Sequence, residues 1–184
     1  MAKYYISDTH FGHTNIIRLA NRPYESIEHM DEDLIAKWNS RVGNGDLVYH
    51  LGDFAFRDVK QYRERLNGQI ILIRGNHDKR LTKQQEECLF VKVCDYKKVK
   101  DGVQTLILFH YPIWSWDGLY KGYTHLHGHI HEKSIRTEHV EQGETLNSKG
   151  RGIRVNVSVE QINYEPKRIE EITKQLEKFS SLTV

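Results

Sequence analysis

The alternation of apolar and polar residues divides the chain into two halves of different character. In the first half, short apolar runs alternate with segments whose apolar side chains recur at helical spacing. In the second half, strand-like runs follow one another with few helical segments between them. The pattern predicts strands at 3–7, 47–51, 69–74, 90–99, 103–109, 122–126 and 153–159, and helices at 31–42, 59–66 and 168–179.

The strand–loop–helix rhythm of the first half is typical of an α/β core. Three apolar strands are each followed by a polar loop and then by a helical pattern. In such sheets, sites form beyond the carboxyl ends of the strands. The strand-like runs of the second half predict a second, more antiparallel sheet. The polar, glycine-containing stretch 141–152 predicts a mobile loop, and the basic stretch 149–154 predicts an exposed turn rather than a phosphate-binding loop.

Length and composition narrow the function classes. A chain of 184 residues fits one domain with a sizeable core. No apolar run approaches the ~20 residues of a membrane span, and the N-terminus lacks an apolar signal core, so we expect a cytoplasmic protein without a membrane partner. The net charge of +2 is too small to indicate nucleic-acid binding by bulk electrostatics. The spacing of Cys88 and Cys94 matches neither a zinc site nor a redox pair, which predicts two reduced thiols.

Histidine is the unusual component of the chain. There are 11 histidines, and five of them fall between His110 and His131. Imidazole, carboxylate and amide groups are the ligands of hydrolytic divalent-metal sites. Five short segments carry these groups at the ends of apolar runs: Asp8-Thr9-His10, Gly52-Asp53, Gly75-Asn76-His77-Asp78, His110 and Gly128-His129-Ile130-His131.

Two of the segments place a pair of ligands on one side of the chain. Asp8 and His10 lie two residues apart just past a strand, and in extended geometry such residues point to the same side. His129 and His131 repeat this spacing. Each pair could therefore share one cation, although Asp-Thr-His taken alone is also compatible with a surface turn.

Two other segments follow glycines at strand ends. Gly52 lets the backbone turn sharply, and the two oxygens of Asp53 can bridge two cations; the alternative for Asp53 is a helix N-cap. Asn76 offers a neutral amide oxygen where carboxylates already supply charge; its alternative is an Asn-type turn. His77, the next residue, would lie near the metals without binding them. That position suits a proton donor or a cation that stabilises the phosphate.

Further residues near these segments are candidates for substrate contact. His13, in the first loop, is compatible with substrate contact and with a plain surface position. Trp114 could stack a nucleobase, although packing against the second sheet is the alternative we favour. Arg57, Arg74 and Lys121 could bind phosphate oxygens or be solvated charges. His29, His50 and His139 are assigned structural or solvated positions. His125 and His127 are assigned positions directly behind the metal ligands or on the sheet surface.

In this order, the five segments resemble the calcineurin-like metallophosphoesterase superfamily. The resemblance runs from Asp8 to about Pro166, and all five motif blocks are intact. The motif Ser7-Asp8-Thr9-His10-Phe11-Gly12-His13 and the triplet His110-Tyr111-Pro112 further resemble a compact bacterial and phage-type subgroup. The resemblance implies a four-layer α/β/β/α sandwich of two mixed β-sheets flanked by helices. It also implies a single domain over residues 1–184, in which no large cap domain fits.

The resemblance also implies seven metal ligands and two catalytic residues. The ligands of the first metal would be Asp8, His10 and His131, and those of the second would be Asn76, His110 and His129. Asp53 would bridge both metals. His77 would be the catalytic or phosphate-stabilising imidazole, and Asp78 would orient it by accepting its ring proton.

The implied activity is hydrolysis of a phosphate diester or monoester. A hydroxide shared by two ions about 3.5–4 Å apart would attack the phosphorus of a small, nucleotide-derived or similar substrate. No ligand is a cysteine, so the softest metals are disfavoured, and Mn²⁺, Fe, Zn, Ni and Co are all compatible. The resemblance favours Mn²⁺ among them. A nuclease of the same fold is the main alternative, and the near-neutral charge argues against it. A non-catalytic scaffold would have lost ligands that are all present here. The oligomeric state stays open.

Overall fold

Two four-stranded sheets form the centre of the protein, whose computed structural model describes residues 1–131 and 152–181. The strand order is β1-β2-β3-β4 in the first sheet and β5-β6-β7-β8 in the second. The first sheet holds β1 (Lys3–Ile6), β2 (Leu47–His50), β3 (Gln69–Ile73) and β4 (Lys92–Cys94), and the second holds β5 (Tyr96–Asp101), β6 (Gln104–Phe109), β7 (Thr124–His127) and β8 (Arg154–Asn156).

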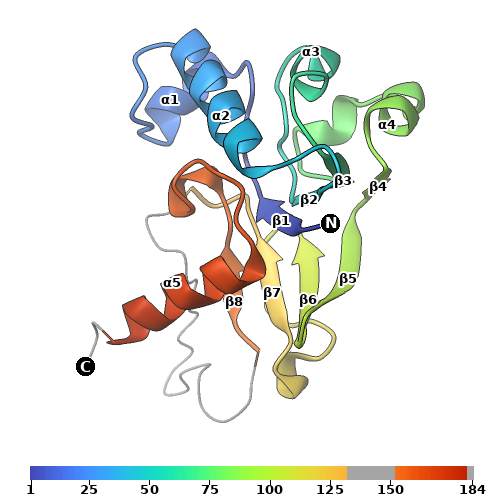
Figure 1. The fold of residues 1–184 in the computed structure, drawn as a ribbon, viewed down its shortest axis with the longest axis vertical. Coiled ribbons are helices and arrows are strands. Elements are labelled where there is room, and N and C mark those ends of the chain that lie inside the picture. Colours follow the sequence, from blue (N-terminus) through green and yellow to red (C-terminus); the bar gives the residue numbers. More distant parts are fainter. Residues whose placement is uncertain (132–151, 182–184) are drawn as a thin grey trace.

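Helices cover the two sheets on their outer sides, as Figure 1 shows. The helices beside the first sheet are α1 (Thr14–Leu19), α2 (Ile27–Arg41), α3 (Val59–Arg63) and α4 (Lys83–Leu89), and α5 (Ile169–Ser181) lies beside the second. This arrangement confirms the predicted α/β sandwich of two sheets flanked by helices. No helix of the described ranges is long and apolar enough to cross a lipid bilayer.

The pairing of the strands differs between the sheets. All three pairs of the first sheet are parallel, and an isolated antiparallel bridge joins Tyr5 to Lys167 at its edge. In the second sheet only β5 and β6 are antiparallel; β6 with β7 and β7 with β8 are parallel. The second sheet is therefore the more antiparallel of the two, as predicted, although two of its three pairs are parallel. The connection between β6 and β7, residues 110–123, is a long crossover rather than a tight hairpin.

The run 90–99, predicted as one strand, is two strands in different sheets. β4 pairs with β3 through Ile73 and Cys94, whereas β5 begins with the pair Tyr96 and Phe109. Neither α1 nor α4 was predicted. α4 buries no side chain and so has no apolar periodicity, although Thr82 and Gln85 form a capping box at its start. α2 begins before the predicted residue 31, because Ser26 caps it.

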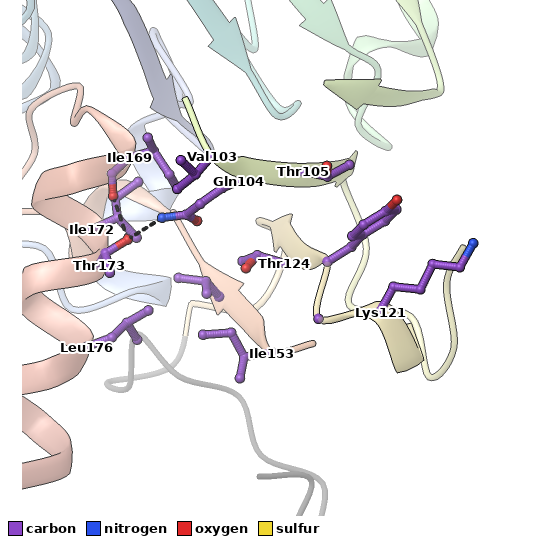
Figure 2. A pocket seen from close by; sticks show the side chains of 13 residues that line it. Val103, Gln104, Thr105, Lys121, Thr124, Ile153, Ile169, Ile172, Thr173 and Leu176 are labelled. Carbon is purple, nitrogen blue, oxygen red and sulfur yellow. Dashed lines mark hydrogen bonds between the residues drawn. The ribbon is translucent and has the colours of Figure 1, made fainter. Parts of the chain in front are cut away.

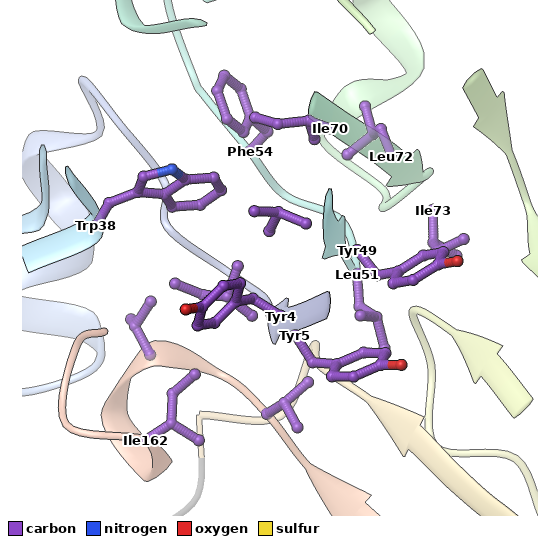
Figure 3. Packing of buried hydrophobic residues seen from close by; sticks show 14 of the residues in the cluster. Tyr4, Tyr5, Trp38, Tyr49, Leu51, Phe54, Ile70, Leu72, Ile73 and Ile162 are labelled. Carbon is purple, nitrogen blue, oxygen red and sulfur yellow. The ribbon is translucent and has the colours of Figure 1, made fainter. Parts of the chain in front are cut away.

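The core lies around β1, β2 and β3 and fixes where these strands end (Figure 3). All four residues of β2 are buried, as in parallel sheets covered on both faces. Tyr5 and Tyr49 stack with their ring centres 5.4 Å apart, and Trp38 of α2 donates a hydrogen bond to the carbonyl of Asn67. The packed strands hold their carboxyl ends at one edge, where the polar loops begin.

Candidate metal centre

The loops that follow β1, β2, β3, β6 and β7 meet at this edge, because the carboxyl ends of parallel neighbouring strands lie side by side. They bring together three sets of residues whose potential ligand atoms lie within 4.8 Å of one another. The sets are Asp8, His10 and His131; His10, Asp53 and His77; and Asp53, His110 and His129. All the predicted ligands from the sequence except Asn76 belong to these sets, and Asn76 contacts the third.

The first group includes two buried atoms, Oδ1 of Asp8 and Nε2 of His10, that have no hydrogen-bond partner among the described residues. These two atoms lie 3.7 Å apart, and Nε2 of His131 lies 3.8 Å from the same Asp8 oxygen. A buried carboxylate oxygen without a partner is costly, and a bound cation would compensate for it. The donor set therefore fits a divalent ion.

The second group lies across Asp53 from the first. Nε2 of His10 and Nε2 of His110 each lie 3.6 Å from the same oxygen, Oδ2 of Asp53. Oδ1 of Asn76 lies 3.0 Å from Nε2 of His110 and 3.1 Å from Nδ1 of His129. Asp53 is therefore positioned between two groups of nitrogen and oxygen donors, as a bridging carboxylate would be.

Hydrogen bonds orient several of these side chains. Nδ1 of His110 lies 2.7 Å from the carbonyl of Leu51, which places the proton on Nδ1 and leaves Nε2 for a cation. Oδ2 of Asp8 accepts from the hydroxyls of Ser7 and Ser158 and from the backbone N–H of His129. The ligands are thus held by their surroundings even without an ion.

The backbone of the site is strained at the ligands themselves. Four of them have a positive φ: Asp8 (58°), His10 (51°), Asp53 (56°) and His129 (69°). Left-handed backbone is uncommon for residues other than glycine and clusters at functional sites. Glycines next to the ligands allow close packing: a Cβ on Gly75 would lie 2.2 Å from Oδ1 of Asp53, and one on Gly128 would lie 2.1 Å from Oδ2 of Asp8.

Charge and burial oppose each other in the centre. Burial disfavours ionised Asp8, but the nearby imidazoles of His10, His110 and His131 hold its pKa below the usual range. Burial raises the pKa of Asp53. The nearby His110 opposes this shift, and the negative charge of Asp8 adds to it. Burial also lowers the pKa of His10 to about 4, so that its imidazole is neutral and free to bind a cation near neutral pH.

A profile of the calcineurin-like phosphoesterase superfamily domain matches residues 1–156. The chain belongs to this superfamily. It is 38% identical over 180 residues to the uncharacterized protein MJ1445 of Methanocaldococcus jannaschii, covering 95% of this chain and 91% of that one. It is also 26% identical over 163 residues to the gene 66 protein of Mycobacterium phage D29, covering 73% and 80% of the two chains.

Two solved structures share the fold of this chain. The protein of unknown function AQ665 from Aquifex aeolicus has a TM-score of 0.69 and 27% identity, with 94% of this chain and 98% of that chain covered. A novel archaeal phosphodiesterase shares the fold, with a TM-score of 0.50, 22% identity and coverage of 85% and 82%. Membership of the superfamily supports a metal-dependent phosphoesterase, and the clustered histidines and aspartates supply candidate ligands for its metal.

His77 of this superfamily member lies at the open side of the centre. Its backbone N–H donates to Oδ1 of Asp53, and Nε2 of its ring lies 3.9 Å from Oδ2 of the same residue. The side chain is 37% exposed, and its ring lies near those of His10 and Phe56. The ring can therefore face both the centre and solvent.

Asp78 has a different role from the one predicted. Its Oδ2 accepts from the backbone N–H groups of Asp53 and Gly75, and its Oδ1 accepts from that of Phe54. Both oxygens of this buried carboxylate are engaged by the backbone, so Asp78 ties the loop after β2 to the loop after β3. It positions Asp53 rather than accepting the ring proton of His77.

Two residues of the site were not predicted, Arg22 and Glu160. Oε1 of Glu160 lies 2.9 Å from Nδ1 of His131 and 2.7 Å from Nη2 of Arg22. Arg22 is buried and donates to the carbonyls of Asp8 and Thr9. Glu160 lies shortly after the end of β8, and this position after a strand could have indicated a residue of the site. Arg22 does not follow a strand, so no such pattern indicates it.

Of the candidate substrate residues, His13 and Arg57 lie near the ligands, whereas the others lie elsewhere or are paired with acidic side chains. His13 lies at the centre, with its Nδ1 3.3 Å from Nδ1 of His10 and its ring stacked on Phe56. Arg57 lines a hollow that also includes His77. Trp114 is half exposed, in the loop after β6. Arg74 is paired with Glu86 and Asp95, which makes it a structural residue.

Lys121 lies before the amino end of β7, at the end of the second sheet opposite the ligands, which follow the carboxyl ends of the strands. It lines a cavity of about 740 Å³ between α5 and the amino ends of β6, β7 and β8 (Figure 2). The prediction of Lys121 as a substrate residue of the metal centre is therefore wrong. The sequence placed it near His110, but the crossover 110–123 carries it away.

The other histidines are mostly buried. His50 contacts the hydroxyl of Thr9, and His125 and His127 are fully buried in the second sheet rather than on its surface. His29 is exposed. His139 and most of the stretches 141–152 and 149–154 lie outside the described residues.

Proposed function

We propose that this protein hydrolyses phosphate esters at a dinuclear metal centre formed by the seven predicted ligands. The observation that carries the proposal is the position of Asp53, whose Oδ2 faces His10 and His110 at 3.6 Å each. Two divalent ions would lower the pKa of a shared water to generate hydroxide and would neutralise charge on the phosphoryl oxygens.

The charges of the ligands suit an anionic substrate. Asp8 and Asp53 are the two carboxylates among the ligands, and Asn76 and the histidines are neutral as ligands. The chain therefore supplies two negative charges, fewer than the positive charges of two divalent ions. The loaded centre would remain cationic and would attract a phosphate ester.

His77 is assigned the role of proton donor to the leaving oxygen. Its side chain is 37% exposed, its ring nitrogen Nε2 lies 3.9 Å from Oδ2 of Asp53, and it lies outside the predicted ligand set. Its backbone bond to Asp53 fixes its distance from the ligands. His13 and Arg57, which lie beside it, are assigned to substrate contact. The nitrogen and oxygen ligands are compatible with Mn²⁺, which we assign on the resemblance to the superfamily. The open position of the centre suits small or nucleotide-derived diesters and monoesters.

The proposal is tested with metal-loaded protein, bis(p-nitrophenyl) phosphate and p-nitrophenyl phosphate. We expect hydrolysis with Mn²⁺, about two bound ions per chain by elemental analysis, and loss of turnover by orders of magnitude in Asp53→Asn. Asp117→Asn is the matched control, because Asp117 is exposed and pairs with Lys98 far from the ligands.

Inactivity of the folded wild-type protein with Mn²⁺, Fe²⁺, Zn²⁺, Ni²⁺ and Co²⁺ would support a non-catalytic scaffold instead. Hydrolysis of short single-stranded DNA alone would support a nuclease. A single bound ion per chain with full activity would contradict the dinuclear centre.

A further inference from the structure

A small cavity of about 160 Å³ opens beside His77, outside the predicted ligand set. Its lining includes Phe56, Arg57, Asp78 and Arg80. Resting on the proposed function, we infer that this cavity binds a second phosphate group of the substrate, joined by a short linker to the phosphate that is hydrolysed. The preferred substrate would then be a phosphate ester that carries another phosphate.

The cavity contains two guanidinium groups without carboxylate partners. Arg57 and Arg80 are both exposed, and within the described residues neither is paired with an acidic side chain. Arg80 instead lies over the ring of Phe56, with its guanidinium carbon 5.6 Å from the ring centre. The ring holds the guanidinium in place while leaving its N–H groups available. Arginine binds phosphate oxygens in bidentate geometry, which makes it suited to this ligand.

The two carboxylates of the cavity are already engaged elsewhere. Asp58 accepts from the backbone N–H of Gln61 and caps α3. Asp78 accepts from three backbone N–H groups, as described above. Neither carboxylate is bonded to Arg57 or Arg80 among the described contacts, so both guanidinium groups remain available to an anionic ligand.

Aromatic contacts connect the cavity to the metal centre. The ring of Phe56 lies 5.6 Å from that of His77 and stacks at 4.1 Å on that of His13, which in turn contacts His10. Arg80 and His77 are thus separated by one ring. The volume equals that of roughly five liquid water molecules, which admits a phosphate group but not a whole nucleotide.

Arg80 is the better residue for the test. Arg57 also lines a larger hollow of about 580 Å³ that contains Glu28, Asp31 and Glu32, so its replacement would change two surfaces. The matched control is Lys79, which is exposed in the same 3₁₀ turn, η1 (Asp78–Arg80), and does not line the cavity. Lys79→Gln removes the same charge from the same region.

The experiment compares thymidine 5′-(p-nitrophenyl phosphate) with and without a 3′-phosphate, using Mn²⁺-loaded protein. We expect the 3′-phosphate to lower KM about tenfold, equivalent to about 1.4 kcal/mol. Arg80→Gln should abolish most of this ratio, and Lys79→Gln should keep it. Thymidine 3′,5′-bisphosphate should likewise inhibit hydrolysis of bis(p-nitrophenyl) phosphate more strongly than thymidine 5′-phosphate does, and Arg80→Gln should remove the difference.

The outcomes separate the two proposals. If the wild-type protein hydrolyses neither ester, the proposed function fails. If it hydrolyses both with the same KM, or if Arg80→Gln weakens both substrates equally, the function stands and the second-phosphate site is wrong. If Lys79→Gln lowers the ratio of the two KM values as much as Arg80→Gln does, the second-phosphate site is also wrong. The effect would then come from the overall positive charge of the region rather than from the cavity.

Discussion

Nδ1 of His131 lies 2.9 Å from Oε1 of Glu160, and this contact turns the other ring nitrogen of His131 toward Asp8. A proton on Nδ1 donates to the carboxylate and leaves Nε2 as the ligand atom. Burial lowers the pKa of His131, but the hydrogen bond and charge of Glu160 outweigh it and raise that pKa. Arg22 fixes Glu160 from the other side and reaches the backbone of Asp8. A ligand from the first sheet and one from the second are thereby held together.

Glu160→Ala should weaken Mn²⁺ binding by roughly 10–100-fold, because His131 loses the partner that fixes its tautomer and orientation. Glu160→Gln should lose less, since its amide oxygen can still accept the Nδ1 proton. Affinity is measured by competition with a chelator, on protein whose folding is checked by circular dichroism.

Glu170→Gln is the control for this comparison, because Glu170 is exposed on α5. If the wild-type protein and Glu160→Ala bind Mn²⁺ with equal affinity, Glu160 serves only to pair with Arg22.

Asp78→Asn should lower the free energy of unfolding by about 1–3 kcal/mol. The carboxamide has one acceptor oxygen instead of two. Its NH₂ group would replace the other oxygen, which now accepts from the backbone, and would face backbone N–H donors. Urea denaturation of the metal-free protein measures the change. An unchanged free energy of unfolding together with a reduced kcat would instead support the orienting role toward His77 that the sequence predicted.

Metal should stabilise the fold through the unpartnered atoms of Asp8 and His10. A single site saturated at 100 times its Kd would add about 2.7 kcal/mol to the free energy of unfolding, seen as a rise in Tm. Asp53→Asn should lose much of this gain, because its carboxylate faces both ligand groups. Addition of EDTA without any fall in the Tm of metal-loaded protein would contradict a metal centre at these residues.

The metal ligands could be predicted because each follows an apolar strand, and parallel strands bring their ends together. Asp8 and Asp53 follow adjacent strands, and their carboxylates lie 3.7 and 3.6 Å from the same ring nitrogen of His10. Asp78 shows where the rule stops: its place next to His77 in sequence suggested a ring contact, whereas its carboxylate turns back to the loop of Asp53.

The remaining part of the site depends on contacts that no local pattern encodes. Arg22 and Glu160 are 138 residues apart in sequence, and only the docking of the second sheet on the first brings them together. The position of Lys121 is another case, since the direction of the crossover after β6 decides which edge of the sheet it reaches.

Acid should destabilise the metal-free protein in part through His125. Burial, opposed by hydrogen bonds with Ile107 and Tyr111, lowers the pKa of His125 to about 4, against about 6.5 in the unfolded chain. Between these values the unfolded state binds more protons, so the free energy of unfolding falls as pH drops below 6.5 and the full penalty is reached below 4. At pH 5 this residue lowers the free energy of unfolding by about 2 kcal/mol.

Urea denaturation in EDTA at pH 7.5 and pH 5.0 measures this effect. The free energy of unfolding should fall less on acidification in His125→Gln than in the wild-type protein. His29→Gln, at an exposed position, should behave as the wild type. An equal loss in wild type and His125→Gln would mean that the acid sensitivity comes from other groups.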